Sequence, residues 1–381
     1  MCNDPVFYSL LCKNDVCMNI RDVIAFLEEK APPSLQENYD NSGLIVGNKL
    51  AEVEGVLISL DCTEAVVEEA KAKGCNLIIS HHPIVFSGLK RLNGSTYVER
   101  VVMLAIKNDI ALYAIHTNLD NVHLGVNKKI AELLRLEDTK ILSPKKSTLN
   151  KLTTFIPKEH SSAVSKALFE AGAGSIGNYE NCGFIAEGTG SFKAKEGANP
   201  FVGQEGQMHF EPEHRLEVVF ENYKTSKVLS TLRKAHPYEE VAYYLQSIEN
   251  VNQNVGSGMI GELQESLSFD AFVEHLKGAM NLSVLKATHK TSDQIKTVAL
   301  CGGSGSFLLK HAIAQNADAY ISSDFKYHEF FDADGHITIF DIGHYESEQF
   351  TIDLLHEWLR EKFSTFALLK TEVITNPINY F

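Results

Sequence analysis

The chain has 381 residues, of which 44% are hydrophobic, and a formal net charge of −14 at pH 7. This length exceeds one ordinary hydrophobic core and predicts two domains. The acidic balance argues against nonspecific binding to nucleic acid or to anionic membranes, because there is no basic surplus to displace counterions. The longest apolar runs are also too short to span a bilayer.

The N-terminal segment and the cysteines bear on the cellular compartment. Residues 1–17 include an apolar stretch but lack a basic start and a clean cleavage pattern, so we interpret them as an extension, with Met18 as an alternative start. The seven cysteines are irregularly spaced and form no Cys-x-x-Cys pair, which is typical of reduced thiols in a cytosolic protein. We therefore expect a cytoplasmic protein.

The first part of the chain, up to residue 148, alternates predicted helices with short apolar strands. Strands are expected at residues 56–60, 77–80 and 110–115, and helices at 63–73, 97–108 and 125–134. A further helical face is formed by Val23, Phe26 and Leu27. Strand–helix units of this length predict right-handed crossovers and a largely parallel sheet.

The pattern changes between residues 149 and 248. Strands are expected at 152–156, 217–220 and 241–245, and helices at 161–171 and 225–235. This β-α-β…β-α-β order predicts an inserted α+β domain with a ferredoxin-like fold. The Gly-rich stretch 188–206 within it is expected to form a long hairpin or an excursion.

The strand–helix alternation then resumes. Strands are expected at 297–300, 319–321 and 337–340, followed by a long amphipathic helix with Phe350, Leu354, Leu355, Trp358 and Leu359 as its buried stripe. We expect this segment to fold back onto the first half and to rejoin one sheet. The sequence thus predicts an α/β metal-binding domain in two halves, residues 18–148 and 249–381, interrupted by the insertion at 149–248.

Imidazole and carboxylate side chains follow three of the predicted strands. They are His81 and His82, then His116 and Asp120, and finally His344 and Glu348. The carboxyl ends of strands are where open α/β sheets bind ligands. Nitrogen and oxygen donors that converge there would suit Zn, Fe, Mn, Ni or Co better than Mg or Ca.

Each of these pieces also has an ordinary structural explanation. In the doublet at 81–82, one ring could pack beneath the loop while the other is exposed. Asp120 could serve a turn, and the pair His344 and Glu348, four residues apart, could be either a chelate or a solvated helix start. His116 could bind metal, hold a ligand in place or be buried and hydrogen-bonded, and we favour the second role. The coincidence of several such strand ends favours a metal site.

Other candidate residues belong to the same crevice or have a different explanation. Asp61 and Asp324 also follow strands and are expected to position substrate or solvent. The turn at residues 302–306 resembles a phosphate cradle at a helix N-terminus, but it matches neither nucleotide-binding pattern, so we favour a tight strand-to-helix turn. The sequence contains no serine nucleophile elbow and no Cys beside an obvious His partner, so nucleophilic catalysis is not indicated.

Taken together, these motifs resemble the Nif-three-like dinuclear metal-centre family, whose members are often labelled GTP cyclohydrolase 1 type 2 homologues. The resemblance covers nearly everything after Met18 and rests on residues 39–44, 80–83, 116–120, 324–328 and 343–348. The middle segment is similar to the PII- and CutA-like insert of longer bacterial members, through residues 172–179 and 235–242.

The resemblance implies two divalent metal ions per chain, with a defined ligand set. One ion would be bound by His81 and Asp120 and the other by His82 and His344, with Glu348 bridging them. The groups expected to hold ligands or position substrate are His116, Asp61, Asp324 and His328. The resemblance also implies a toroidal homohexamer with the metal sites facing an internal cavity.

The sequence therefore favours a metal-dependent hydrolase that acts on a nucleotide-like or phosphoester substrate. The alternative is a non-enzymatic scaffold that senses a metal or a ligand, in which the inserted domain binds a small molecule or a partner. A basic cavity lining or measured turnover would favour the enzyme, and tight binding without turnover would favour the scaffold.

Overall fold

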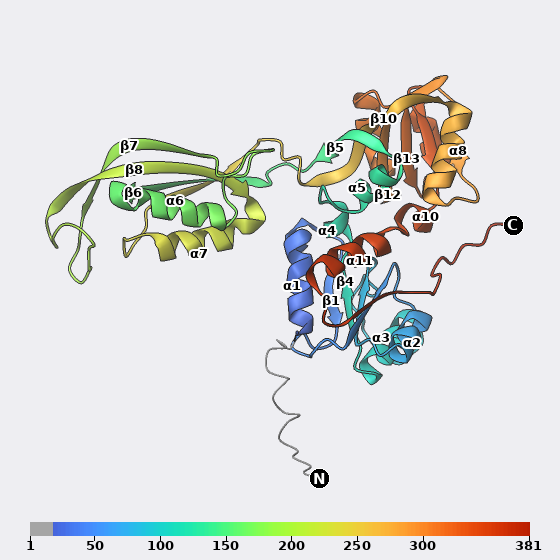
Figure 1. Ribbon diagram of the computed structural model, residues 1–381, viewed down its shortest axis with the longest axis horizontal. Helices are drawn as coiled ribbons and strands as arrows, with labels where there is room; N and C mark the ends of the chain where they lie inside the picture. Colours follow the sequence, from blue (N-terminus) through green and yellow to red (C-terminus); the bar gives the residue numbers. More distant parts are fainter. Residues whose placement is uncertain (1–17) are drawn as a thin grey trace, which may run out of the picture. The chain divides into compact units, whose positions relative to one another are not determined.

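The computed structural model describes residues 18–381, so the predicted extension at residues 1–17 lies outside the described part (Figure 1). The described chain divides into two compact units. The larger unit comprises residues 18–143 and 257–381, and the smaller unit comprises Pro144–Gly256. The fold is mixed α/β, with three sheets in the described part.

The first sheet of the larger unit has the strand order β1-β4-β3-β2-β15. Its strands are β1 (Gly43–Val46), β4 (Ala111–Ala114), β3 (Leu77–Ser80), β2 (Gly55–Ser59) and β15 (Ala367–Lys370). All are parallel except β1, which pairs antiparallel with β4. The chain thus returns to this sheet near its C-terminus through β15, a strand that the sequence did not predict.

Helices cover both faces of the first sheet (Figure 1). On one side lie α2 (Glu64–Ala72) and α3 (Tyr97–Lys107), and on the other α1 (Ile20–Lys30) and α11 (Thr351–Lys362). Every residue of β2, β3 and β4 is buried, which explains their uninterrupted apolar sequences. Thr63 caps α2 as predicted, because its side chain accepts a hydrogen bond from the amide of Val66.

The second sheet of the larger unit has the order β11-β14-β13-β12-β10-β5. Its strands are β11 (Lys286–Ala287), β14 (Thr338–Asp341), β13 (Ala319–Ser323), β12 (Gln294–Ser304), β10 (Gly256–Ser268) and β5 (Leu136–Pro144). Only β12, β13 and β14 are parallel to one another, and β10 and β11 pair antiparallel with them. The prediction that these strands rejoin the first sheet was wrong. The long strand β10, which we had not predicted, pairs with β12 and anchors a separate sheet.

Helices on the second sheet pack through apolar side chains. They are α8 (Phe269–Met280), α9 (Leu309–Ala314) and α5 (Val126–Leu133), and two short helices, α4 (Thr117–Asp120) and α10 (His344–Glu348), lie at strand ends. Phe272 of α8 packs edge-to-face on Phe340, and Leu309 of α9 packs in a buried cluster with Tyr320 and Ile339.

The smaller unit is a four-stranded antiparallel sheet, β7-β8-β6-β9, with two helices. Its elements are β6 (Leu149–Pro157), α6 (Ser161–Glu170), β7 (Gly183–Lys193), β8 (Met208–Glu221), α7 (Thr225–Ala235) and β9 (Tyr243–Ile248). Strands β7 and β8 form a long antiparallel hairpin, as expected for the Gly-rich stretch. Leu152, Leu168, Leu216 and Leu232 lie in the buried cluster of this unit.

We expect the smaller unit to be removable without unfolding the larger one. Its two ends are adjacent, because the amide of Lys145 donates to the carbonyl of Val255 at 3.0 Å, and each unit has its own buried cluster. A chain in which a short Gly-Ser linker replaces residues 144–256 should be soluble and melt cooperatively, as measured by circular dichroism. Aggregation or a broad, noncooperative transition would show that the two units share a core.

Within residues 18–381, none of the helices combines the length and apolar content that crossing a bilayer requires.

Candidate metal centre

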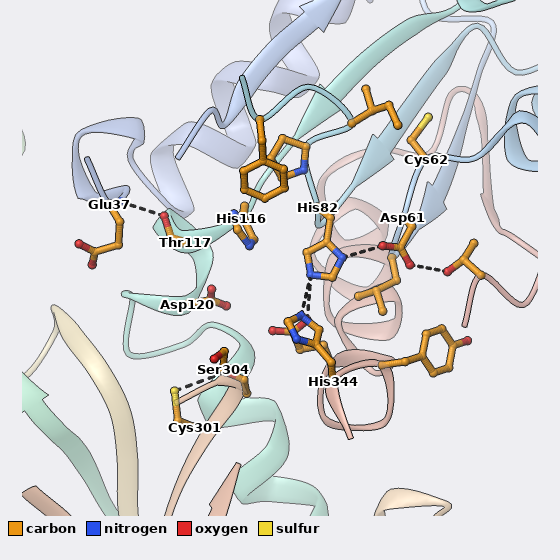
Figure 2. Close-up of a pocket in the computed structure, with 18 of the residues that line it drawn as sticks. Glu37, Asp61, Cys62, His82, His116, Thr117, Asp120, Cys301, Ser304 and His344 are labelled. Carbon is orange, nitrogen blue, oxygen red and sulfur yellow. Dashed lines mark hydrogen bonds and ion pairs between the residues drawn. The ribbon is translucent and has the colours of Figure 1, made fainter. Parts of the chain in front are cut away.

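The carboxyl ends of strands from both sheets of the larger unit face one cavity of about 730 Å³. From the first sheet come His82, which follows β3, and Asp61, which follows β2; from the second comes His344, which opens α10 after β14. Figure 2 shows His82 between Asp61 and His344, with His116 and Asp120 beside them. The structure therefore brings together the candidate residues of distant chain segments.

His81 belongs to the same cluster of donor residues and is fully buried. Its Nδ1 lies 2.9 Å from the carbonyl oxygen of Ile115, and because a carbonyl only accepts, Nδ1 must carry the proton. Burial lowers the pKa of His81 to about 4, despite the raising effect of Glu348. The ring is therefore neutral near pH 7, and its Nε2 presents a lone pair.

That lone pair faces two carboxylate oxygens, at distances too long for a hydrogen bond. Nε2 of His81 is 3.6 Å from Oδ1 of Asp120 and 3.8 Å from Oε1 of Glu348. Both distances exceed a hydrogen bond, and the buried Nε2 of His81 and Oδ1 of Asp120 have no hydrogen-bond partner. Burial, and then the charge of Glu348, raise the pKa of Asp120. A cation bound here would take the place of the proton that the raised pKa favours on Asp120, and it would satisfy all three electron-pair donors.

A second group of donors lies around the other oxygen of the same glutamate. Oε2 of Glu348 is 3.0 Å from Nε2 of His82 and 3.1 Å from Nε2 of His344, and the two Nε2 atoms are 3.3 Å apart. Ligands bonded to one tetrahedral ion at about 2.0–2.2 Å lie roughly 3.4 Å apart. These separations suit a single ion with three ligands.

In this second group, protonated imidazoles are hydrogen-bonded to carboxylates. Burial would lower the pKa of His82, but hydrogen bonds to Asp61 and Glu348 outweigh it and raise that pKa to about 10. Burial would likewise lower the pKa of His344, but hydrogen bonds to Asp324 and Glu348 outweigh it and raise that pKa to about 11. A metal ion would replace these Nε2 protons, because imidazole binds metal in its neutral form.

Two carboxylates fix the orientation of the His82 and His344 rings by accepting hydrogen bonds from their Nδ1 atoms. Asp61 accepts from Nδ1 of His82 at 2.8 Å, and Asp324 accepts from Nδ1 of His344 at 2.5 Å. Asp61 also accepts a hydrogen bond from the hydroxyl of Thr375 at 2.6 Å. Because Nδ1 is the donor in each ring, Nε2 must point into the cluster, which is the usual arrangement of a carboxylate behind a metal-binding histidine.

His116 closes one side of the cluster. Its ring centroid lies 5.2 Å from that of His81 and 5.3 Å from that of His82. Its Nδ1 donates to Asp40 at 2.8 Å, and Asp40 also accepts from the amide and the hydroxyl of Thr117. Burial opposes these hydrogen bonds, but they outweigh it and hold the pKa of Asp40 well below its usual range.

His328 lies elsewhere. It is exposed on the 3-10 helix η5 (Tyr327–Ala333), where its ring contacts Tyr327 and Phe331. It is not among the residues that line the cavity, and a role for it at the site stays a prediction.

The turn at residues 302–306 forms no phosphate cradle. The backbone amides of Gly302, Gly303 and Gly305 already donate to the side chains of Asn127, Ser347 and Ser322. A Cβ at Gly303, whose φ is +63°, would lie 2.3 Å from Oε1 of Glu348. The glycines therefore leave room for the glutamate at the centre of the cluster, and the tight turn that we favoured is the better description.

We expect Gly303→Ala to displace the carboxylate of Glu348 and to reduce the metal content of purified protein severalfold, as measured by elemental analysis. Gly335→Ala is the matched control, because Gly335 also has a positive φ, +72°, but has open space around it. Both variants should lose about 1 kcal/mol of stability from the left-handed backbone. Equal metal content in the two variants would argue against this function of Gly303.

Three residues of this arrangement escaped the sequence-based reasoning. Asp40 follows no strand, Thr375 lies in a C-terminal segment without periodicity, and Gly303 was assigned only to a turn. The signal for Asp40 was its place in the motif at residues 39–44, which we had used for the family resemblance without giving it a role.

The cavity lining is not basic. Among the described residues that line it there is no Lys and no Arg. The thiol of Cys301 also lines it, but burial, together with the charges of Asp120 and Glu348, raises the pKa of Cys301 far above its usual range, so a reactive thiolate is not formed. The chemistry available in the cavity is that of imidazoles, carboxylates and any metal they bind.

Comparisons with known proteins give a consistent relationship. The family model described as Duf34/NIF3 (NGG1p interacting factor 3) matches residues 18–377. A GTP cyclohydrolase 1 type 2 homolog from Halalkalibacterium halodurans is 37% identical, over 95% of this chain and 99% of that protein. A protein of the same name from Bacillus subtilis is 34% identical, over 95% and 99%.

Solved structures agree with these relatives. A Bacillus cereus protein related to NIF3 has a TM-score of 0.85 and 35% identity, covering 96% of this chain and 100% of that one. A Staphylococcus aureus protein has a TM-score of 0.75 and 30% identity, covering 96% and 99%.

Proposed function

The chain belongs to the Duf34/NIF3 family, and on that premise we propose that it is a metal-dependent hydrolase with a dinuclear centre. The observation that carries the proposal is the group of buried donor atoms around His81, of which Nε2 of His81 and Oδ1 of Asp120 have no hydrogen-bond partner. The name of its relatives, GTP cyclohydrolase 1 type 2 homolog, points toward hydrolysis of a nucleotide-like substrate. A phosphoester is the second substrate class.

We assign the ligands in two groups that share one glutamate. His81, Asp120 and Glu348 would hold one ion, and His82, His344 and Glu348 the other; the donor atoms within each group lie within 4.8 Å of one another. His81, His82 and His116 form a further group of this kind, but the bond from His116 to Asp40 favours a role beside the ligands. Nitrogen and oxygen donors suit Zn, Fe, Mn, Ni or Co.

Bound divalent ions would supply Lewis-acid polarisation of the substrate and acidify a water molecule. The residues of the chain supply orientation. Asp61 and Asp324 fix the rings of His82 and His344, and His116, held by Asp40, presents an imidazole at the edge of the cavity. His116 would there hold a substrate group or move a proton. The homohexamer and the cytoplasmic location expected from the sequence stay predictions.

A substrate panel on metal-analysed protein tests the proposed activity. Nucleotides and phosphoesters would be incubated with the loaded chain, and release of phosphate or of ring-opened product would be followed. Glu348→Gln is the control, because it keeps the shape of the side chain but removes the charge between the ions. Turnover that this variant lacks would support the enzyme.

The scaffold remains the second candidate, and one observation favours it. The lining lacks the basic residues that we expected of an enzyme acting on anionic substrates. Tight binding of a panel member with no turnover by fully loaded protein would decide for the scaffold.

A further inference from the structure

The charges around the cavity restrict what it can bind. The residues of the described chain that line it include the acids Glu37, Asp61, Asp120 and Glu348 and, as noted above, no Lys or Arg. Proteins that bind phosphate chains commonly surround them with Arg, Lys or free backbone amides. Here the amides of the one glycine-rich turn at the cavity are already bonded to side chains.

Metal loading would not make the cavity strongly positive. Two divalent ions would bring four positive charges. Four carboxylates oppose them: Asp120 and Glu348 among the donors, and Asp61 and Asp324, each bonded to a donor ring. With neutral imidazoles, the loaded centre is close to electrically neutral. A triphosphate would gain little there from charge attraction, and it would lie beside further acids.

The cavity lining also has an apolar and aromatic part, here called the aromatic wall, whose residues belong to none of the donor groups. It includes Phe86, Tyr97, Phe307 and Ile378, all of them exposed. Phe86 is 50% exposed and its ring meets that of His116 edge-to-face, with centroids 5.6 Å apart. Phe307, in the short 3-10 helix that follows β12 of the second sheet, is 64% exposed. Rings of this kind offer flat faces on which a planar ligand can stack.

We propose that the cavity takes a planar heteroaromatic ring that is uncharged or singly charged, and that it discriminates against ligands with a polyphosphate chain. The polar edge of the ring would face the metal cluster, and its apolar surface would lie against the aromatic wall. A volume of about 730 Å³ suits a ligand the size of a nucleoside. This inference rests on the proposed metal centre and names the substrate class for it.

Binding measurements test the inference without any need for turnover. Calorimetric titration of metal-loaded full-length protein would compare purine, pyrimidine and pterin bases, their nucleosides, GMP, GTP and inorganic triphosphate. At least one base or nucleoside should bind, GTP should bind more weakly than guanosine, and inorganic triphosphate should not bind. Metal content would be measured after each titration, because a polyphosphate can extract ions.

Two variants distinguish binding in the cavity from binding at other surfaces. Phe86→Ala should weaken the ring ligand tenfold or more while leaving metal content unchanged. Phe331→Ala is the control, since that ring is also exposed, at 65%, and lies outside the cavity lining. GTP that binds as tightly as guanosine, or more tightly, would overturn the proposed discrimination. A panel in which no ring compound binds would overturn the proposed ring ligand. Binding of a ring compound without turnover would exclude the hydrolase but would still support the proposed ring ligand.

Discussion

Glu348→Ala is expected to empty both metal sites and to abolish any turnover. The carboxylate is buried, and its two oxygens face different groups of donors, His81 on one side and His82 with His344 on the other. Burial alone would raise the pKa of Glu348, but the hydrogen bonds from His344 and His82 outweigh it and hold the pKa well below its usual range. Without this shared anion, each ion would lose a ligand and the charge that balances it.

The expected result is a fall from two ions per chain to almost none, measured by elemental analysis after loading and desalting. Glu346→Ala is the matched control, because that acid lies on the same short helix but bonds to Asn376 and belongs to none of the donor groups; it should retain both ions. His82→Ala should mainly weaken one site. A Glu348→Ala protein that still melts cooperatively and keeps one tightly bound ion would refute the bridging assignment.

The sequence predicted the strands of the site better than it predicted how the two halves meet. Strands such as β2 and β3 are buried on both faces, so they read as continuous apolar runs. Strand β10 is almost entirely buried over its first six residues and mostly exposed over the rest, and β5 carries several charged residues. Without these two strands, a single sheet was the natural expectation, and it was wrong.

The residues of the candidate site also divide into those that the strand pattern located and those that it did not. His81, His82 and His344 follow predictable strands, so the periodicity of the sequence located them. Asp120 was assigned as a ligand only through the family resemblance, because a turn was its ordinary explanation; the structure places it at the end of helix α4 with a buried oxygen facing His81. Contacts made by residues far apart in the chain, such as Thr375 with Asp61, depend on the path of the C-terminal segment, which carries no periodic signal.

Removal of the bound ions is expected to lower the melting temperature by about 10 °C and to abolish turnover. In the metal-free cluster, the buried carboxyl of Asp120 keeps an oxygen without a partner, so the folded state loses stabilisation that the ion provides. A ligand present at a thousand times its Kd stabilises by about 4 kcal/mol, and in a unit of this size each kcal/mol shifts the melting temperature by roughly 2–4 °C.

Chelation, dialysis and calorimetry would measure this effect, and Mn, Fe, Co or Zn would then be added back. Both stability and activity should return, with affinity rising in that order from Mn to Co, while Mg and Ca should restore little because they prefer oxygen ligands. The Glu348→Ala protein is the control, since its melting temperature should not respond to chelator. Turnover that persists in protein shown by elemental analysis to be free of metal would exclude the hydrolytic mechanism, because the described chain offers the cavity no activated nucleophile to replace the ions.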